Sequence, residues 1–137
     1  MKTKGIVPVI ILFFLFAVFP ACQKESNPNP SPTDARTKFL GTWTVTEYKK
    51  KASYEVNITA DESSSDGVLI YNFGAFGAGI TATAFVKANS ITLDADQEIV
   101  PGVIINGGGS YSATPEITWT YTINTGADLI TVNAKYR

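Results

Sequence analysis

Phe39-Leu40-Gly41-Thr42-Trp43-Thr44-Val45 is the stretch at which the character of this 137-residue chain changes. Residues 23–34 before it are polar and rich in proline, and they offer no apolar side chain that could anchor to a core. Residues 42–48 instead alternate in the manner of a β-strand. One face of that strand carries Trp43, Val45 and Glu47. The stretch therefore predicts the start of a folded β-domain that continues to the end of the chain.

The same period-two pattern continues downstream and is strongest at residues 117–123, where Ile117, Trp119, Tyr121 and Ile123 alternate with threonines. Residues 129–137 repeat it, with inner positions at Ile130, Val132, Ala134 and Tyr136. Pro101-Gly102 removes a ladder donor from residues 98–105 and suggests an edge, a bulge or two short pieces. We interpret Asn106-Gly107-Gly108-Gly109 as a glycine-rich connection into a strand that begins at Ser110.

These segments amount to about eight strands joined by short turns, with no crossover helix between them. Such a pattern predicts an all-β domain over residues 36–137, built as an antiparallel up-and-down barrel or, alternatively, as a β-sandwich. Threonines on one face and branched or aromatic residues on the other indicate a sheet with one buried side. Eight strands can close around packed side chains or one small ligand.

Gly41-Thr42-Trp43, at the start of the first strand, resembles the Gly-x-Trp motif of the lipocalins and related calycins. The resemblance implies an eight-stranded barrel in which Trp43 packs across the closed end. It also implies that a cation from the last strand rests against this indole ring, with Arg137 the first choice and Lys135 the second. Gly41, Trp43 and Arg137 are thus the expected barrel-closing residues. The alternative is that Trp43 is an ordinary core residue of a sandwich.

The N-terminal segment has the features of an export signal. Lys2 and Lys4 precede a mostly apolar run that is too short to span a bilayer, and Ala21 stands directly before Cys22, the only cysteine. Residues 1–21 resemble the signal of a bacterial lipoprotein, which implies acylation of Cys22; a spare cysteine in a secreted protein is the alternative. Residues 22–35 then form a disordered tether. Gln23-Lys24-Glu25, with no aspartate directly after the cysteine, resembles lipoproteins sent to the outer membrane. Tether and domain together resemble lipoproteins of Bacteroidetes.

Composition excludes several classes of function. The net charge is −1 and no basic surface stands out, so we expect no nucleic-acid partner. With no histidine and one cysteine, the usual catalytic bases and nucleophiles are missing, and we predict no enzyme and no cofactor. Two acidic segments could offer Ca²⁺ oxygen ligands, but exposed acidic turns rarely bind it, and we predict no metal site. Their acidic residues are Asp61, Glu62, Asp66, Asp94, Asp96 and Glu98.

The inner aromatic residues are the best candidates for ligand contact. If the barrel leaves a cavity, these rings could stack on a small apolar or glycan ligand while their polar tips orient it. The alternative is that the same rings simply fill the core. The protein would then be a structural or accessory interaction module of a surface complex, using outward aromatics such as Tyr48 and Phe85. The candidate ligand-binding residues are Tyr54, Trp119, Tyr121 and Tyr136.

Overall fold

The computed structural model describes residues 33–50 and 52–137. The expected export signal, Cys22 and most of the expected tether lie outside the described residues. Within the described ranges, no helix is both long and apolar enough to cross a bilayer.

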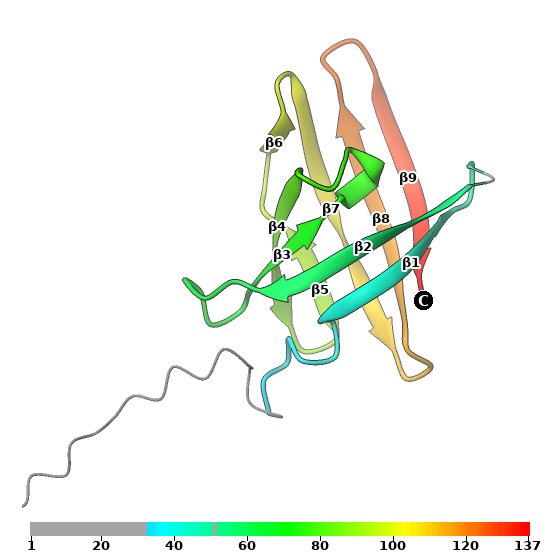
Figure 1. Cartoon of the computed structure of the whole chain (residues 1–137). Coiled ribbons are helices and arrows are strands. Elements are labelled where there is room, and N and C mark those ends of the chain that lie inside the picture. The colour runs from blue at the N-terminus through cyan, green and yellow to red at the C-terminus, as the bar shows by residue number, and fades with distance from the viewer. Residues whose placement is uncertain (1–32, 51) are drawn as a thin grey trace, which may run out of the picture.

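The described chain forms nine antiparallel strands and one short 3₁₀ turn, η1 (Figure 1). In chain order the elements are β1 (Gly41–Glu47), β2 (Ser53–Ala60), β3 (Gly67–Tyr71), η1 (Phe73–Ala75), β4 (Thr81–Lys87), β5 (Ser90–Leu93), β6 (Gln97–Val100), β7 (Val103–Ser112), β8 (Glu116–Asn124) and β9 (Leu129–Tyr136). The alternation predicted from the sequence is present where it was clearest, because buried and exposed positions alternate along β1, β4 and β8.

Eight of these strands close into a barrel. Each strand pairs with its neighbour, β9 returns to β1, and β5 pairs with β7, so that the ring has no free side. β6 lies outside this ring as a ninth strand paired to the start of β7. The prediction of an antiparallel up-and-down barrel is confirmed and is consistent with a lipocalin-like barrel. The sandwich alternative is wrong because the β5–β7 pairing joins what would have been two separate edges.

The glycine run does not connect two strands, as the sequence had suggested, but lies inside one. β7 continues without interruption from Val103 to Ser112, and its glycines pair with β5 on one side and β8 on the other. A Cβ atom on Gly107 would lie 2.4 Å from the Thr120 carbonyl oxygen, and one on Gly108 would lie 2.8 Å from the Ile91 carbonyl oxygen. Glycine is required because the backbones approach too closely for any side chain.

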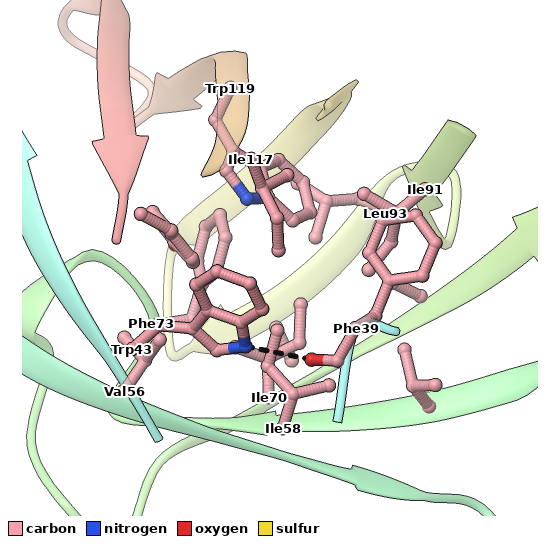
Figure 2. Close-up of a cluster of buried hydrophobic side chains, with 14 of the residues drawn as sticks. Phe39, Trp43, Val56, Ile58, Ile70, Phe73, Ile91, Leu93, Ile117 and Trp119 are labelled. Atoms are coloured by element: carbon pink, nitrogen blue, oxygen red, sulfur yellow. Dashed lines mark hydrogen bonds between the residues drawn. The ribbon is translucent and has the colours of Figure 1, made fainter. Parts of the chain in front are cut away.

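One end of the barrel is closed by Phe39 and Trp43. Two overlapping turns over residues 34–39 bring Phe39 into the core, where it is fully buried. The Trp43 indole N–H donates to the Phe39 carbonyl oxygen at 2.8 Å, as Figure 2 shows. Tyr111 of β7 packs edge-on against both rings, at centroid distances of 5.6 and 6.4 Å. We call this the closed end.

The opposite end, which we call the mouth, is uneven in height. The β6–β7 and β8–β9 hairpins extend beyond the shorter strands at this end, while η1 folds in front of them (Figure 1). β1 pairs with β9 only from Val45 to Glu47, so the first residues of β9 have no partner on that side. Ile130, expected to face the core, is therefore 45% exposed. Ile130 lies on the predicted face of β9, but β1 does not extend far enough along β9 to cover it.

Candidate functional site

Three of the four predicted aromatic residues meet inside the barrel. Trp119, Tyr121 and Tyr136 are essentially fully buried, and the rings of Trp119 and Tyr136 lie 5.5 Å apart. Phe73 from η1 packs on Trp119 and Tyr121 at centroid distances of 5.7 and 4.7 Å. In the present arrangement the rings contact one another and Phe73. Their role as ligand contacts stays a prediction.

The fourth aromatic residue, Tyr54, leads to a buried acid. The Tyr54 hydroxyl donates to Glu47 Oε1 at 2.8 Å, and the Tyr121 hydroxyl donates to the same oxygen at 3.3 Å. Lys50 approaches the other oxygen, with Nζ 3.0 Å from Oε2. Glu47 is only 3% exposed and is the one buried charged residue of the described chain. The carboxylate is tolerated there because both oxygens have partners.

The buried hydroxyls around Glu47 stay protonated. Burial, reinforced by the charges of its neighbours, raises the pKa of Tyr54 far above its usual value. Burial and the Glu47 carboxylate likewise raise the pKa of Tyr121. The pKa of Tyr136 is raised mainly by burial, and then by Tyr121 and Glu47. All three phenols therefore remain hydrogen-bond donors over the physiological range.

Two buried polar atoms in the barrel have no hydrogen-bond partner. They are the indole Nε1 of Trp119 and the hydroxyl oxygen of Tyr136. A buried donor without an acceptor costs about 1–3 kcal/mol, and such groups usually face an ordered water or a ligand. The barrel interior therefore retains two polar groups whose hydrogen-bonding capacity the described protein atoms do not use.

A pocket opens to solvent directly beside Glu47. It has a volume of about 150 Å³, with apolar walls from β8 and β9 and with two lysines of the β1–β2 turn at its rim. A volume of this size accepts a molecule about as large as benzene. We call it the mouth pocket. Its lining residues are Glu47, Lys49, Lys50, Ile123, Ile130, Thr131, Val132 and Asn133.

The closed end differs in detail from the arrangement that the resemblance implied. Trp43 lies across it, but the Arg137 Nε donates to Glu116 Oε2 at 2.7 Å, and the Arg137 side chain is largely exposed. Lys135 also pairs with Glu116, at 3.1 Å. The cation found over aromatic rings at this end is Lys38, whose Nζ lies 5.7 Å from the ring centroids of both Phe39 and Tyr111. Gly41 has a φ of 117° at the first position of β1.

The carboxylates of the acidic segments accept hydrogen bonds from nearby backbone and side-chain groups. Asp61 accepts hydrogen bonds from the Ser63 backbone and hydroxyl, and the Ser64 hydroxyl donates to Asp66. Asp96 accepts from the Asn106 amide, while Glu98 accepts from the Gly102 backbone N–H. In the described ranges no three acidic, cysteine or histidine side chains gather closely enough to hold a metal ion.

Sequence reasoning identified the tyrosines but missed the acid and the pocket. Glu47 falls on the inner face of β1 with Trp43 and Val45, and this position was the available signal that its carboxylate would be buried. Nothing in the sequence indicated the mouth pocket, because the pocket depends on how far β9 extends past β1.

The fold and site define a closed antiparallel β-barrel with a small amphipathic pocket at its mouth. Comparison of the chain with protein-family models, with curated proteins and with solved structures finds no match.

Proposed function

We propose that this chain is a non-enzymatic, lipid-anchored protein of the cell envelope whose lipocalin-like barrel binds a small, largely apolar ligand in the mouth pocket. The observation that carries the proposal is the combination of three apolar side chains with one buried carboxylate in an accessible space of about 150 Å³. Ligand sites are typically apolar spaces with a few placed polar groups. This pocket has that composition on a smaller scale, which favours a ligand or ligand tail with one ring over a glycan.

The proposed cellular location rests on the N-terminal sequence. Signal-like residues 1–21, Cys22 and the polar segment after it support acylation at Cys22, with attachment to the outer membrane through lipid. Replacing Cys22 by serine should abolish incorporation of labelled fatty acid and move the protein from the membrane fraction to the soluble fraction. Retention of the Cys22→Ser protein in the membrane fraction would contradict the proposed anchor.

The chemistry of the site supports binding over catalysis. Its ionisable side chains are Glu47, Lys49 and Lys50, and the carboxylate is already engaged by two phenols and an ammonium group. Among the described residues that line the mouth pocket, no serine, cysteine or histidine is present to supply the commonest nucleophiles and base of covalent catalysis.

The binding proposal is tested by titrating the mature chain, in detergent, with benzene, cyclohexanol and glucose while melting temperature and amide NMR shifts are recorded. Benzene and cyclohexanol should raise the melting temperature and shift amides of β8 and β9, whereas glucose should do neither. Ile130→Lys should abolish the effect because it places a charge in the pocket wall. Leu129→Lys is the matched control, since Leu129 is 70% exposed and lies outside the pocket lining. No response to any compound would overturn the proposal.

The second candidate is an accessory module that binds another envelope protein. A broad hollow of about 760 Å³ on the outer side of the barrel favours it, because Leu40, Leu69 and Tyr71 contribute apolar surface there beside the acidic turn at residues 61–63. Leu69→Lys would weaken such a partner contact and leave ligand binding at the mouth unchanged. The same substitution would have no effect on envelope assembly if the mouth pocket is the only functional surface.

A further inference from the structure

The two oxygens of Glu47 are held in different ways. Oε1 accepts from the hydroxyls of Tyr54 and Tyr121, which are anchored in the barrel. Within the described residues, Oε2 is held by Lys50 alone, at 3.0 Å. One oxygen is therefore fixed by the core, and the other is paired with a residue from the rim of the mouth pocket.

Lys50 is a partner that can be replaced. Its side chain is 55% exposed, while that of Glu47 is 3% exposed. An exposed ammonium group on a flexible four-carbon stem loses rotamer entropy when it is held in one ion pair and is well solvated when released. The buried carboxylate, in contrast, needs a cation beside it in every state. Another ammonium group could take this position if it brought its own stabilisation.

The pocket walls provide that stabilisation. Ile123, Ile130 and Val132 lie beside Glu47 and would remove a small apolar body from water. Burial of apolar surface contributes about 25 cal/mol per Å², a term that the exposed stem of Lys50 does not gain. A neutral ligand would leave the Glu47–Lys50 pair in place. An anionic ligand would bring a second negative charge toward the carboxylate and could pair only with the rim lysines.

From this geometry we propose that the mouth pocket selects a small apolar primary amine, with its ammonium group on Glu47 Oε2 in place of Lys50 and its apolar body between β8 and β9. The inference rests on the proposed function and specifies the class of ligand. Lys50 then acts as a resident competitor that neutralises the buried carboxylate while the pocket is empty.

The test uses three probes that share one ring: benzylamine, benzyl alcohol and benzoate. Each is titrated calorimetrically into the mature full-length chain at pH 7 and moderate salt. Benzylamine should bind about tenfold more tightly than benzyl alcohol, because only the amine brings a positive charge that can replace Lys50 in the ion pair with Glu47. Glu47→Gln should remove this preference while leaving an acceptor oxygen for Tyr54 and Tyr121.

Lys50→Met supplies a second variant; because it leaves the buried Glu47 carboxylate without its cation, its folding is verified by circular dichroism before it is titrated. It should tighten benzylamine binding several-fold because the competitor is gone. Lys49→Met is the matched control, since it removes the same charge from the same rim but breaks no contact with Glu47. An equal gain in both variants would mean that rim charge alone is responsible, and it would overturn the competitor role.

The two proposals fail differently. If benzoate or benzyl alcohol binds at least as well as benzylamine, the amine class is wrong and small-ligand binding stands. If no probe binds the wild-type chain or Lys50→Met, both are wrong.

Discussion

A carboxylate occupies an inner position of β1 where strand alternation would normally place an apolar side chain. Glu47 is accommodated there because it is contacted by two phenol hydroxyls and one ammonium group, and these partners come from β2, β8 and the β1–β2 turn. It thereby links β1 to β8, which lies on the far side of β9 in the barrel and is distant in sequence. A single residue thus connects core packing to the accessible pocket.

The role of Glu47 in folding is tested by comparing two substitutions. Glu47→Ala should lower the free energy of unfolding by about 3 kcal/mol, since it leaves two buried hydroxyls and an ammonium group without their acceptor. Glu47→Gln keeps an acceptor oxygen and should lose only about 1 kcal/mol. Chemical denaturation of both variants measures the difference. Equal losses would show that the hydrogen bonds to Oε1 contribute little.

The buried phenols should be visible in an alkaline titration. The chain has six tyrosines, and burial raises the pKa of Tyr54, Tyr121 and Tyr136. Near pH 11 these three tyrosines should remain protonated in the native protein, as followed by ultraviolet absorbance. The unfolded chain releases these protons above about pH 10 and the native barrel does not, so stability should fall as pH rises past 10. Ionisation of all six before unfolding would contradict the buried network.

At the scale of elements, β7 is the strand that closes the barrel. Its three consecutive glycines allow the backbone to lie close to β5 and β8 at once. They also make room for large side chains on β8, because Gly107 lies opposite Tyr121 and Gly109 opposite Trp119. A Cβ atom on Gly109 would approach the Trp119 ring to 3.0 Å. The absence of side chains on one strand accommodates the aromatic core of the next.

Gly107→Ala is the substitution that tests this closure. Gly107 has a φ of 141°, and an added Cβ would also lie 2.5 Å from the Tyr121 Cα. Strain and overpacking together should cost about 3 kcal/mol of unfolding free energy. Gly79→Ala is the control, since nothing lies within 4 Å of its Cβ position and its φ is not in the left-handed region; its effect should be near zero or slightly stabilising. Similar melting temperatures for the two variants would rule out the close approach.

At the scale of the whole molecule, residues 34–39, which we call the latch, join the start of the domain to the barrel. The Arg36 guanidinium donates from one nitrogen to the carbonyl oxygens of Asp61, Ser64 and Gly67, and it pairs with Asp34 at 2.7 Å. That pair holds the pKa of Asp34 below its usual value. Residues 34–39 are thus attached to the β2–β3 turn before Phe39 enters the closed end. The expected tether, residues 22–35, overlaps this latch at its last two residues.

Arg36→Ala should therefore destabilise the entire barrel and not only its N-terminal segment. Loss of a charged donor to three carbonyl groups should lower the free energy of unfolding by about 2 kcal/mol. Lys87→Ala, at an exposed end of β4, is a control with an expected change within about 0.5 kcal/mol. Urea unfolding followed by tryptophan fluorescence compares them. An unchanged midpoint for Arg36→Ala would show that the latch is independent of the barrel.

The same latch predicts a response to acid. The lowered pKa of Asp34 means that its contribution to stability is present above about pH 4, the unfolded value, and is lost as pH falls through the folded value. Asp34→Asn should be less stable than the wild type at pH 7 and should lose less stability between pH 5 and pH 2. Parallel acid unfolding curves for the two proteins would exclude a role for this carboxylate.

Outside residues 98–112, the sequence by itself determined the approximate strand positions and which face of most strands is buried. Successive side chains of a strand point to opposite faces, and residues two apart share a face. The shared inner face of Trp119 and Tyr121 could therefore be recognised without the partner strands. Tertiary structure alone decided that β5 meets β7, that the glycines lie inside β7, and that Ile130 projects beyond the barrel. Each of these depends on strand register and length across pairs distant in sequence. The site divides in the same way: the tyrosines were predictable, whereas their convergence on Glu47 and the pocket beside it required the closed barrel.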